Sequence, residues 1–359
     1  MDMILLLALG LLLLLALILL TGKLCRARRY KIRTEAGVQR TEYITIGGIG
    51  QYIQIRGWDR ANPVMLILHG GPGGSMAYYS YGWQAELERH YTVVHWDQRG
   101  CGNTYFHDTG AARPTLELLL SDLDELVDYL RSTFDQEKVV LMGHSWGTYL
   151  GALYAGRHGE KMSAYVAVSQ MLDFKKSEEV SAREAMGLAR AAGRERDAEE
   201  IGGMLADLLA ARTFGKTEAT ALLKLRQKKE KYLPPQYPRG MGAVRIFSPY
   251  MTWNDFKWML SFENMIASNG ELYRALLSEE TATIDGSRRR YEMPVILVAG
   301  ARDWTTPRCL AEAYFDHISA PRKELIVMED AGHIPFLDRP DEFSEKLLNT
   351  LKKVEDHLK

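Results

Sequence analysis

Few cysteines, almost no net charge and no internal repeats restrict the classes of protein to which this sequence can belong. The three cysteines among its 359 residues are odd in number and lack the spacing of metal ligands, so neither a disulfide framework nor a metal site is expected. A formal net charge of -1 gives no reason to expect nucleic acid as a partner, because proteins that bind it usually carry a concentrated positive surface. With 46% hydrophobic and 25% charged residues, the composition is that of a globular protein.

Positive charge is also absent before the first apolar segment, although it follows that segment closely. Residues 4–20 contain no charged side chain, and residues 3–22 have the ~20-residue length with which an α-helix crosses a bilayer. Six lysines and arginines lie between residues 23 and 33. Because such flanks stay on the cytoplasmic side, we expect residues 1–22 to form a single-pass transmembrane anchor in the lipid bilayer. Residues 23–40 would then form a basic juxtamembrane linker, with the rest of the chain on the cytoplasmic side.

A cleaved secretory signal is the alternative interpretation of this N-terminal segment. Such a signal has positive charge before its apolar run and a cleavage site with small residues after it. Here the charges follow the run, and residues 19–23 (LLTGK) make a poor cleavage site. We therefore favour an uncleaved anchor.

Beyond the linker, apolar patterning predicts an α/β protein with a mostly parallel sheet. Residues 41–56 alternate as in a β-hairpin. Short β-branched runs bounded by glycine or polar residues predict strands buried on both faces, and the helical stretches between them favour a doubly wound sheet. The buried strands are expected at Val64–Leu68, Thr92–His95, Val139–Met142, Ala164–Val168, Val295–Val298 and Glu324–Met328.

Helical spacing predicts three helices in the core and an inserted helical cap. The core helices are expected at Leu116–Phe134, Gly147–Ala155 and Asp341–Leu358, with Asp122, Asp124 and Glu125 on the outer face of the first. Residues 172–290 contain hardly any strand-like run, which predicts a cap that divides the core into residues 41–171 and 291–359. The cap helices are expected at Ser177–Ala192, Ala198–Ala211, Ala219–Lys231 and Trp253–Met265.

Residues 143–147 (GHSWG) carry the strongest chemical signal. They follow a predicted strand and precede a small-residue helix, which is the strand–turn–helix setting of a G-x-S-x-G nucleophile elbow. Glycines are needed there because side chains at those positions would collide with the adjoining strand and helix. We predict that Ser145 is a nucleophile; the alternative is a glycine-rich turn with an unreactive serine.

A serine nucleophile requires a base and an acid, which follow it in this order in such folds: serine, acid, histidine. Asp303 and His333 each lie just after a predicted strand, at the sheet edge where open α/β folds place their sites. We predict Asp303 as the acid and His333 as the base. Asp303 as a helix N-cap is the alternative, and Asp330 is a weaker candidate because it lies too close to His333 in sequence.

Two further glycine-rich segments complete the expected site. The oxyanion of the transition state needs preorganised donors, for which we predict the backbone N–H of Trp146 and that of Gly71 or Gly70 in residues 69–74 (HGGPGG). In residues 96–102 (WDQRGCG), Asp97 and Arg99 are expected to pair and to support the floor of the site. Together these features predict the α/β-hydrolase fold and a reaction that needs neither cofactor nor metal.

The segments HGGPG, DQRGCG and GHSWG, in this order, resemble the proline iminopeptidase family of α/β-hydrolases. The resemblance extends from about residue 41 to the C-terminus and implies a helical cap and the removal of N-terminal residues from peptides. His144 departs from it, since the family has glycine there. The family's cap supplies acidic residues for the substrate amine, and Glu263, Glu179 and Glu184 are the tentative counterparts; the alternative is that they belong to solvated helix faces.

We therefore predict a membrane-anchored serine hydrolase of aminopeptidase type that acts on a small peptide or ester. A carboxylesterase or lipid hydrolase is the alternative within enzymes, whereas epoxide hydrolase or dehalogenase chemistry would require aspartate at position 145. A non-catalytic binding protein of the same fold is a more remote alternative, because such proteins usually lack a triad member. The sequence makes no prediction of oligomeric state.

Overall fold

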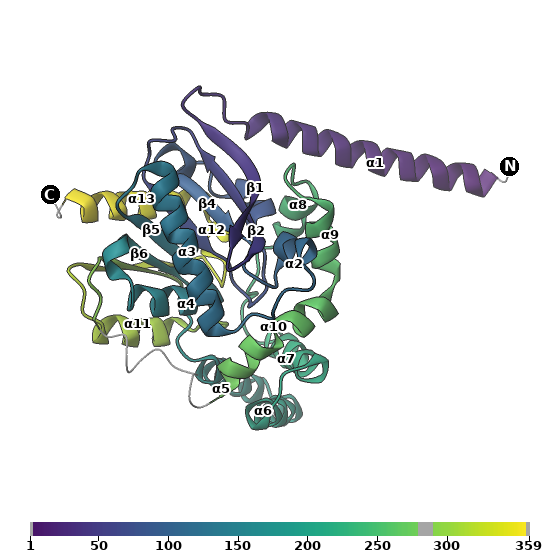
Figure 1. Ribbon diagram of the computed structural model, residues 1–359. Coiled ribbons are helices and arrows are strands. Elements are labelled where there is room, and N and C mark those ends of the chain that lie inside the picture. Colours follow the sequence, from purple (N-terminus) through teal and green to yellow (C-terminus); the bar gives the residue numbers. More distant parts are fainter. Residues whose placement is uncertain (1–2, 279–289, 357–359) are drawn as a thin grey trace.

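A computed structural model, describing residues 3–278 and 290–356, contains an eight-stranded sheet with helices on both faces (Figure 1). The strand order is β1-β2-β4-β3-β5-β6-β7-β8. The hairpin β1–β2 and the pair β2–β4 are antiparallel, whereas all pairs from β4 to β8 are parallel, so the predicted mostly parallel sheet is confirmed. The strands are β1 Val38–Ile46, β2 Ile49–Gly57, β3 Val64–Leu68, β4 Thr92–Trp96, β5 Val139–His144, β6 Met162–Val168, β7 Val295–Gly300 and β8 Lys323–Met328.

The central strands are apolar throughout because helices cover both faces of the sheet. In β3, Leu66 and Leu68 join the core beneath α3 and α4, whereas Met65 and Ile67 join a second core that α13 covers. Alternating side chains of one strand therefore stabilise two different layers. The helices around the sheet are α2 Gly102–His107, α3 Leu116–Phe134, α4 Trp146–Ala155, α11 Arg308–His317, α12 Pro335–Asp338 and α13 Pro340–Asp356.

Two details of these helices differ from the sequence prediction. Asp122 was expected on the outer face of α3, but it is fully buried and accepts hydrogen bonds from Arg99 and Gln51. An ion pair with a distant partner offsets the cost of burying this carboxylate, which helical spacing cannot predict. The final helix is observed as far as Asp356, and the predicted end of the helix at Leu358 lies outside the described residues.

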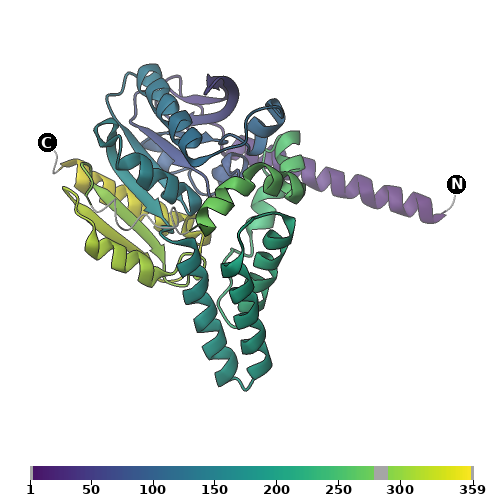
Figure 2. The same cartoon turned by 60° about the horizontal axis from the view of Figure 1, so that its bottom comes forward.

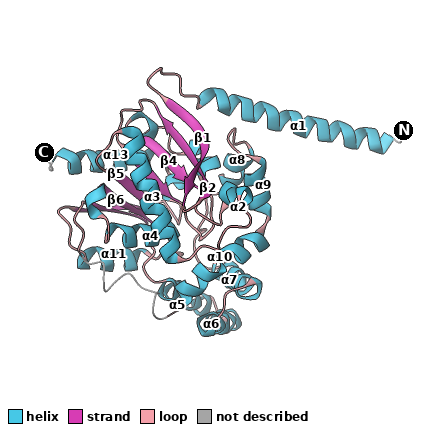
Figure 3. Cartoon of the chain, viewed as in Figure 1, coloured by secondary structure: helices cyan, strands magenta, loops and turns pink. Residues whose placement is uncertain are grey.

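The described part of the segment between β6 and β7 is mainly helical, as Figure 3 shows by colour, and we refer to α5–α10 as the cap helices. Helices α5 and α6 project away from the sheet as a long pair (Figure 2). The helix predicted over Trp253–Met265 is in fact two helices, because the backbone leaves helical geometry at Ser261. Residues 279–289 of the predicted cap lie outside the described residues. The cap helices are α5 Phe174–Ala191, α6 Glu195–Ala210, α7 Lys216–Lys229, α8 Met241–Ile246, α9 Trp253–Leu260 and α10 Phe262–Leu277.

The N-terminal helix α1 (Met3–Arg29) extends away from the body of the molecule (Figures 1 and 2). Its 27 described residues include none that is buried, and by length and composition it can cross a membrane. Its last turns contact the cap, where the Arg26 guanidinium lies 4.8 Å from the centre of the Phe247 ring. The Tyr30 backbone carbonyl, just beyond the helix, accepts a 2.6 Å hydrogen bond from Arg56.

Candidate active site

Ser145 occupies a sharp turn between β5 and α4. Its backbone has φ 52° and ψ -118°, a conformation in the positive-φ region that serine rarely adopts. The turn is possible because two glycines flank it. A Cβ atom at Gly143 would lie 2.5 Å from the carbonyl oxygen of Gly147, and one at Gly147 would lie 2.2 Å from that of Leu68. The local sequence therefore holds the Ser145 side chain at the C-terminal edge of the parallel sheet.

Three side chains from distant parts of the chain meet at this edge. The Oγ of Ser145 lies 3.0 Å from Nε2 of His333, and the other ring nitrogen, Nδ1, lies 3.0 Å from Oδ2 of Asp303. All three residues are buried. With Nδ1–H donated to the carboxylate, Nε2 is left as an acceptor for the serine hydroxyl.

Asp303 is held by donors other than His333. Its Oδ1 accepts from the backbone N–H groups of Thr305 and Thr306 at 2.9 Å, and its Oδ2 accepts from the Thr306 hydroxyl at 2.7 Å. Burial favours the neutral carboxyl, but the His333 ring and the Thr306 donors outweigh burial and hold the pKa of Asp303 below its usual value. Asp303 therefore stabilises the turn that follows it and is not the helix N-cap considered as the alternative, because α11 begins at Arg308 with Pro307 as its N-cap.

His144 supports the backbone of His333. Burial, reinforced by the nearby His333, lowers the pKa of His144 to about 3, so its ring is neutral at physiological pH. Its Nε2 lies 2.9 Å from the carbonyl oxygen of His333, and the Ser169 hydroxyl donates to the same oxygen at 3.0 Å. Sequence reasoning noted His144 only as a departure from a family pattern and did not find Ser169.

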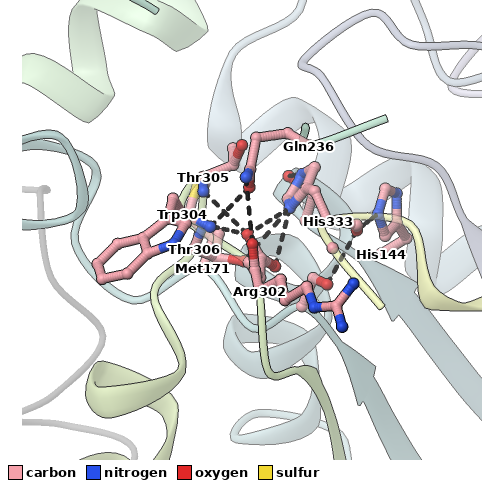
Figure 4. Close-up of polar contacts among 12 residues, drawn as sticks. His144, Met171, Gln236, Arg302, Trp304, Thr305, Thr306 and His333 are labelled. Carbon is pink, nitrogen blue, oxygen red and sulfur yellow. Dashed lines mark hydrogen bonds and ion pairs between the residues drawn. The ribbon is translucent and has the colours of Figure 1, made fainter. Parts of the chain in front are cut away.

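Gln236, in the loop between α7 and α8, connects the acid and base loops (Figure 4). Its Oε1 accepts from the Trp304 N–H at 2.6 Å, and its Nε2 donates to the Arg302 carbonyl at 3.1 Å. Its backbone carbonyl accepts from the N–H of His333 at 3.2 Å. One cap residue thus contacts both neighbours of Asp303 and the backbone of His333. No sequence signal indicated this role beyond its position among three prolines.

The glycine loop after β3 lies beside Ser145. Gly71 has φ +120°, and a Cβ atom there would lie 2.5 Å from the N of Gly73. Gly70 and Gly71 both line the cavity that contains Ser145, and no hydrogen bond within the described residues uses the N–H of Gly71. The N–H of Trp146 follows Ser145 directly at the first position of α4, where helices leave such groups without an intrahelical partner.

The predicted pairing of Asp97 with Arg99 is wrong. Arg99 forms a bidentate ion pair with Asp122 at 2.8 and 3.0 Å. Asp97 instead accepts from the Ser75 hydroxyl at 2.6 Å and from the backbone N–H of Asn103 at 2.8 Å. The two side chains have separate partners because residues two positions apart in a turn can point to different parts of the molecule, here the glycine loop and the β1–β2 hairpin. Both remain buried and structural, Arg99 beneath β1–β2 and Asp97 beside the glycine loop.

A cavity of about 220 Å³ contains Ser145 and His333 and extends beneath the cap helices. None of the three cap acids named from the sequence is among its described lining residues. Glu263 is exposed and pairs with Lys216, Glu179 lies near Lys176 and Arg183, and Glu184 is exposed on α5. The structure therefore places these acids outside the described lining of the cavity at Ser145.

Within the described residues, neither a larger hollow nor a cluster of metal-ligand side chains marks a second site. A larger hollow of about 810 Å³, between Pro63 and α13, contains none of the residues predicted to act in catalysis. Within residues 3–278 and 290–356, no group of three histidine, cysteine or acidic side chains is arranged to hold a metal ion.

The sheet order, the serine turn and the three converging side chains define a protein of the α/β-hydrolase class. Residues 63–340 match the family model described as alpha/beta hydrolase fold, so the chain belongs to that family. It is 26% identical over 321 residues to "Probable aminopeptidase YbaC" of Bacillus subtilis (strain 168), covering 88% of this chain and 95% of that protein. It is also 26% identical over 285 residues to a proline iminopeptidase of Heyndrickxia coagulans, covering 78% and 87%.

The solved structures that resemble this fold include a bacterial membrane phospholipase A. The TM-score is 0.60 at 18% sequence identity, and the match covers 97% of this chain and 98% of that one. At this identity the likeness concerns the fold alone. The relatives named as peptidases nevertheless confirm the expected resemblance to the proline iminopeptidase family.

Proposed function

We propose that this protein is a serine hydrolase that works through Ser145, His333 and Asp303. The observation that carries the proposal is the continuous contact from serine to histidine to carboxylate, with two distances of 3.0 Å. A serine is activated when a base lies within hydrogen-bond reach of its hydroxyl and a third group orients that base.

In the proposed reaction, His333 accepts the hydroxyl proton of Ser145 as the oxygen attacks a substrate carbonyl. Asp303 fixes the ring tautomer and stabilises the imidazolium that forms. The N–H groups of Trp146 and Gly71 would stabilise the oxyanion. The imidazolium then protonates the leaving group, and water hydrolyses the acyl-enzyme with His333 again as base.

A fluorophosphonate probe tests the nucleophile directly. We expect the full-length chain to be labelled and Ser145→Ala to lose all labelling. Ser132→Ala, an exposed serine on α3, is the matched control and should label normally. Labelling of Ser145→Ala at the normal rate would contradict the assignment.

The names of the relatives support a peptidase that removes N-terminal residues from small peptides. A carboxylesterase or lipid hydrolase is the second candidate, favoured by the exposed apolar helix α1, which would hold the enzyme beside membrane substrates. The peptidase and the lipid hydrolase can be distinguished by comparing the turnover of proline p-nitroanilide with that of p-nitrophenyl esters of increasing acyl length. Faster cleavage of the anilide supports the peptidase, and rates that rise with acyl length support the lipid hydrolase.

We further propose that α1 is a single-pass anchor with the hydrolase on the cytoplasmic side. Apolar side chains on α8 and α9, including Ile246, Trp253 and Leu260, are exposed on the part of the cap nearest to α1. We expect the full-length chain to stay with membranes after alkaline extraction, with its catalytic part protected from external protease in intact cells. A chain that has lost about its first twenty residues, as judged by mass, would support a cleaved signal instead.

A further inference from the structure

The cavity at Ser145 carries positive charge and lacks acidic side chains. Arg226 of α7 and Arg245 of α8 both line it, and its described lining includes no aspartate or glutamate. His144, which lines the cavity together with His333, is neutral, as described above. Among the described lining residues, Arg226 and Arg245 are therefore the side chains with a full charge, and the Asp303 carboxylate lies behind His333.

Arg226 belongs to a cluster in which two cations share one anion. Its Nε and Nη2 both donate to Oε1 of Glu178, at 2.8 and 2.6 Å, whereas Lys229 donates to the other oxygen of the same carboxylate. Glu178 and Lys229 are buried. Glu178 offsets positive charge within this cluster, and Arg226 is its member that faces the cavity of Ser145.

Arg245 has no carboxylate partner at all among residues 3–278 and 290–356. Its guanidinium lies 5.1 Å from the centre of the Tyr79 ring, which also lines the cavity. Its Nε is buried and has no hydrogen-bond partner in the described structure. A buried donor on a charged group is costly to leave unpaired, and arginine is well suited to bidentate contact with a carboxylate or phosphate.

We propose that Arg245, assisted by Arg226, binds an anionic group of the substrate, so that the enzyme prefers small acyl compounds carrying a carboxylate or phosphate. This inference rests on the proposed hydrolase function and narrows its substrate class. The cavity of about 220 Å³ is smaller than the ~300–1,000 Å³ typical of drug-sized ligands, so the anion lies within a few bonds of the scissile carbonyl. In a peptide substrate, that group is the terminal carboxylate of a dipeptide.

The same charge disfavours a free amine next to Arg226 and Arg245, so the ammonium of a dipeptide would lie away from these two side chains. An ammonium group would meet two guanidinium groups and no acidic side chain among the described lining residues. This agrees with the positions of Glu179, Glu184 and Glu263 outside the cavity.

Isosteric substrate pairs test the proposal with the full-length protein in detergent. The peptide pair is Pro-Gly and Pro-glycinamide, and the ester pair is 4-butyryloxybenzoate and 4-butyryloxybenzamide. Both peptides carry the same N-terminal ammonium, so the anionic and uncharged members of each pair are named for the carboxylate and for the amide that replaces it. A third ester, 4-butyryloxyphenyl phosphate, distinguishes phosphate from carboxylate recognition. We expect kcat/KM of the natural chain to be about tenfold or more higher for an anionic member than for its uncharged partner, as one charge-assisted contact allows.

Variants of Arg245 show whether this side chain causes the preference. We expect Arg245→Gln to lower kcat/KM for the anionic member by about 10- to 100-fold, mainly through KM, and to change the uncharged member less than about threefold. Arg245→Lys should restore part of the preference because the positive charge remains. Arg239→Gln, an exposed arginine six residues earlier, is the matched control and should change neither rate.

Two results would overturn the inference: preference of the natural chain for the uncharged member of both pairs, or an equal loss on both members in Arg245→Gln. Turnover of the uncharged ester reports that each variant is folded. Ser145→Ala separates this inference from the proposed function. If that variant keeps hydrolysing either ester, the nucleophile assignment fails, whereas the charge preference is still judged from Arg245.

Discussion

Gln236 offers the clearest test of how the cap supports the site. Its side chain donates to the Arg302 carbonyl and accepts from the Trp304 N–H, the two residues that flank Asp303. In Gln236→Ala both of these hydrogen bonds disappear, as does a local one from Nε2 to the Pro234 carbonyl, while the bond from the His333 N–H to the backbone carbonyl of residue 236 can remain. At about 1 kcal/mol for each of the two bonds that flank Asp303, their loss is about 2 kcal/mol.

Only part of that free energy serves to hold Asp303 in line with His333. The full value of about 2 kcal/mol is therefore an upper limit for the effect of the substitution on the activation free energy. A full 2 kcal/mol corresponds to about a 30-fold decrease in kcat. Asp303 keeps its contacts with Thr305 and Thr306, so we expect a smaller decrease, of about 3- to 30-fold.

The assay is the rate of fluorophosphonate labelling together with ester turnover, measured alongside the urea midpoint. Gln227→Ala, an exposed glutamine on α7, is the control and should match the natural chain in both. Unchanged labelling in Gln236→Ala would refute a positioning role. A loss as complete as that of Ser145→Ala, at an unchanged urea midpoint, would also refute it, because it would place Gln236 in the chemistry.

Three further predictions concern buried charges. Arg99→Met should lower the free energy of unfolding by about 3–5 kcal/mol, measured by urea denaturation, because Asp122 stays buried without its guanidinium partner; the loss should be smaller when Asp122→Asn is added. Asp303→Asn should slow fluorophosphonate labelling by about 10³–10⁴-fold at normal protein yield, since the tautomer of His333 is no longer fixed. Burial, and then the charge of Asp97, raises the pKa of Asp255 to about 7, above its unfolded value of 3.8. The folded state then binds more protons than the unfolded state, so the free energy of unfolding falls as pH rises from about 4 to 7. Urea denaturation should show that the free energy of unfolding of the natural chain falls relative to that of Asp255→Asn over this range. A relative rise would contradict the prediction.

Much of the core could be predicted because its signals are local. The strand Val64–Leu68 has the predicted bounds, since a strand buried on both faces is an uninterrupted apolar run between polar residues. The turn at Ser145 was equally visible, because steric crowding at Gly143 and Gly147 restricts those positions to glycine. Asp303 and His333 were found by their places after strands, which the parallel sheet brings to one edge.

The errors concern residues whose roles depend on partners distant in sequence. Asp122 has the spacing of a surface residue on α3, but a guanidinium from the loop after β4 makes its burial possible. Glu179 and Glu184 were named as counterparts of the cap acids that the family resemblance implies, whereas the buried acid of that helix is Glu178, next to Glu179. A shift of one residue turns a helix position by about 100°, so sequence alone could not tell which acid faces inward.

In the proposed mechanism, the cap would therefore contribute to catalysis and to specificity through different segments. Gln236 fixes the acid and base loops from the α7–α8 connection, whereas Arg226 and Arg245 lie on the helices to either side and face the cavity. Displacing that connection would break the contacts of Gln236 with Arg302, Trp304 and His333, at a cost of about 1 kcal/mol each. Substrate is therefore expected to reach Ser145 without movement of this loop, and a bound anion between the two arginines would further stabilise the arrangement that catalysis requires.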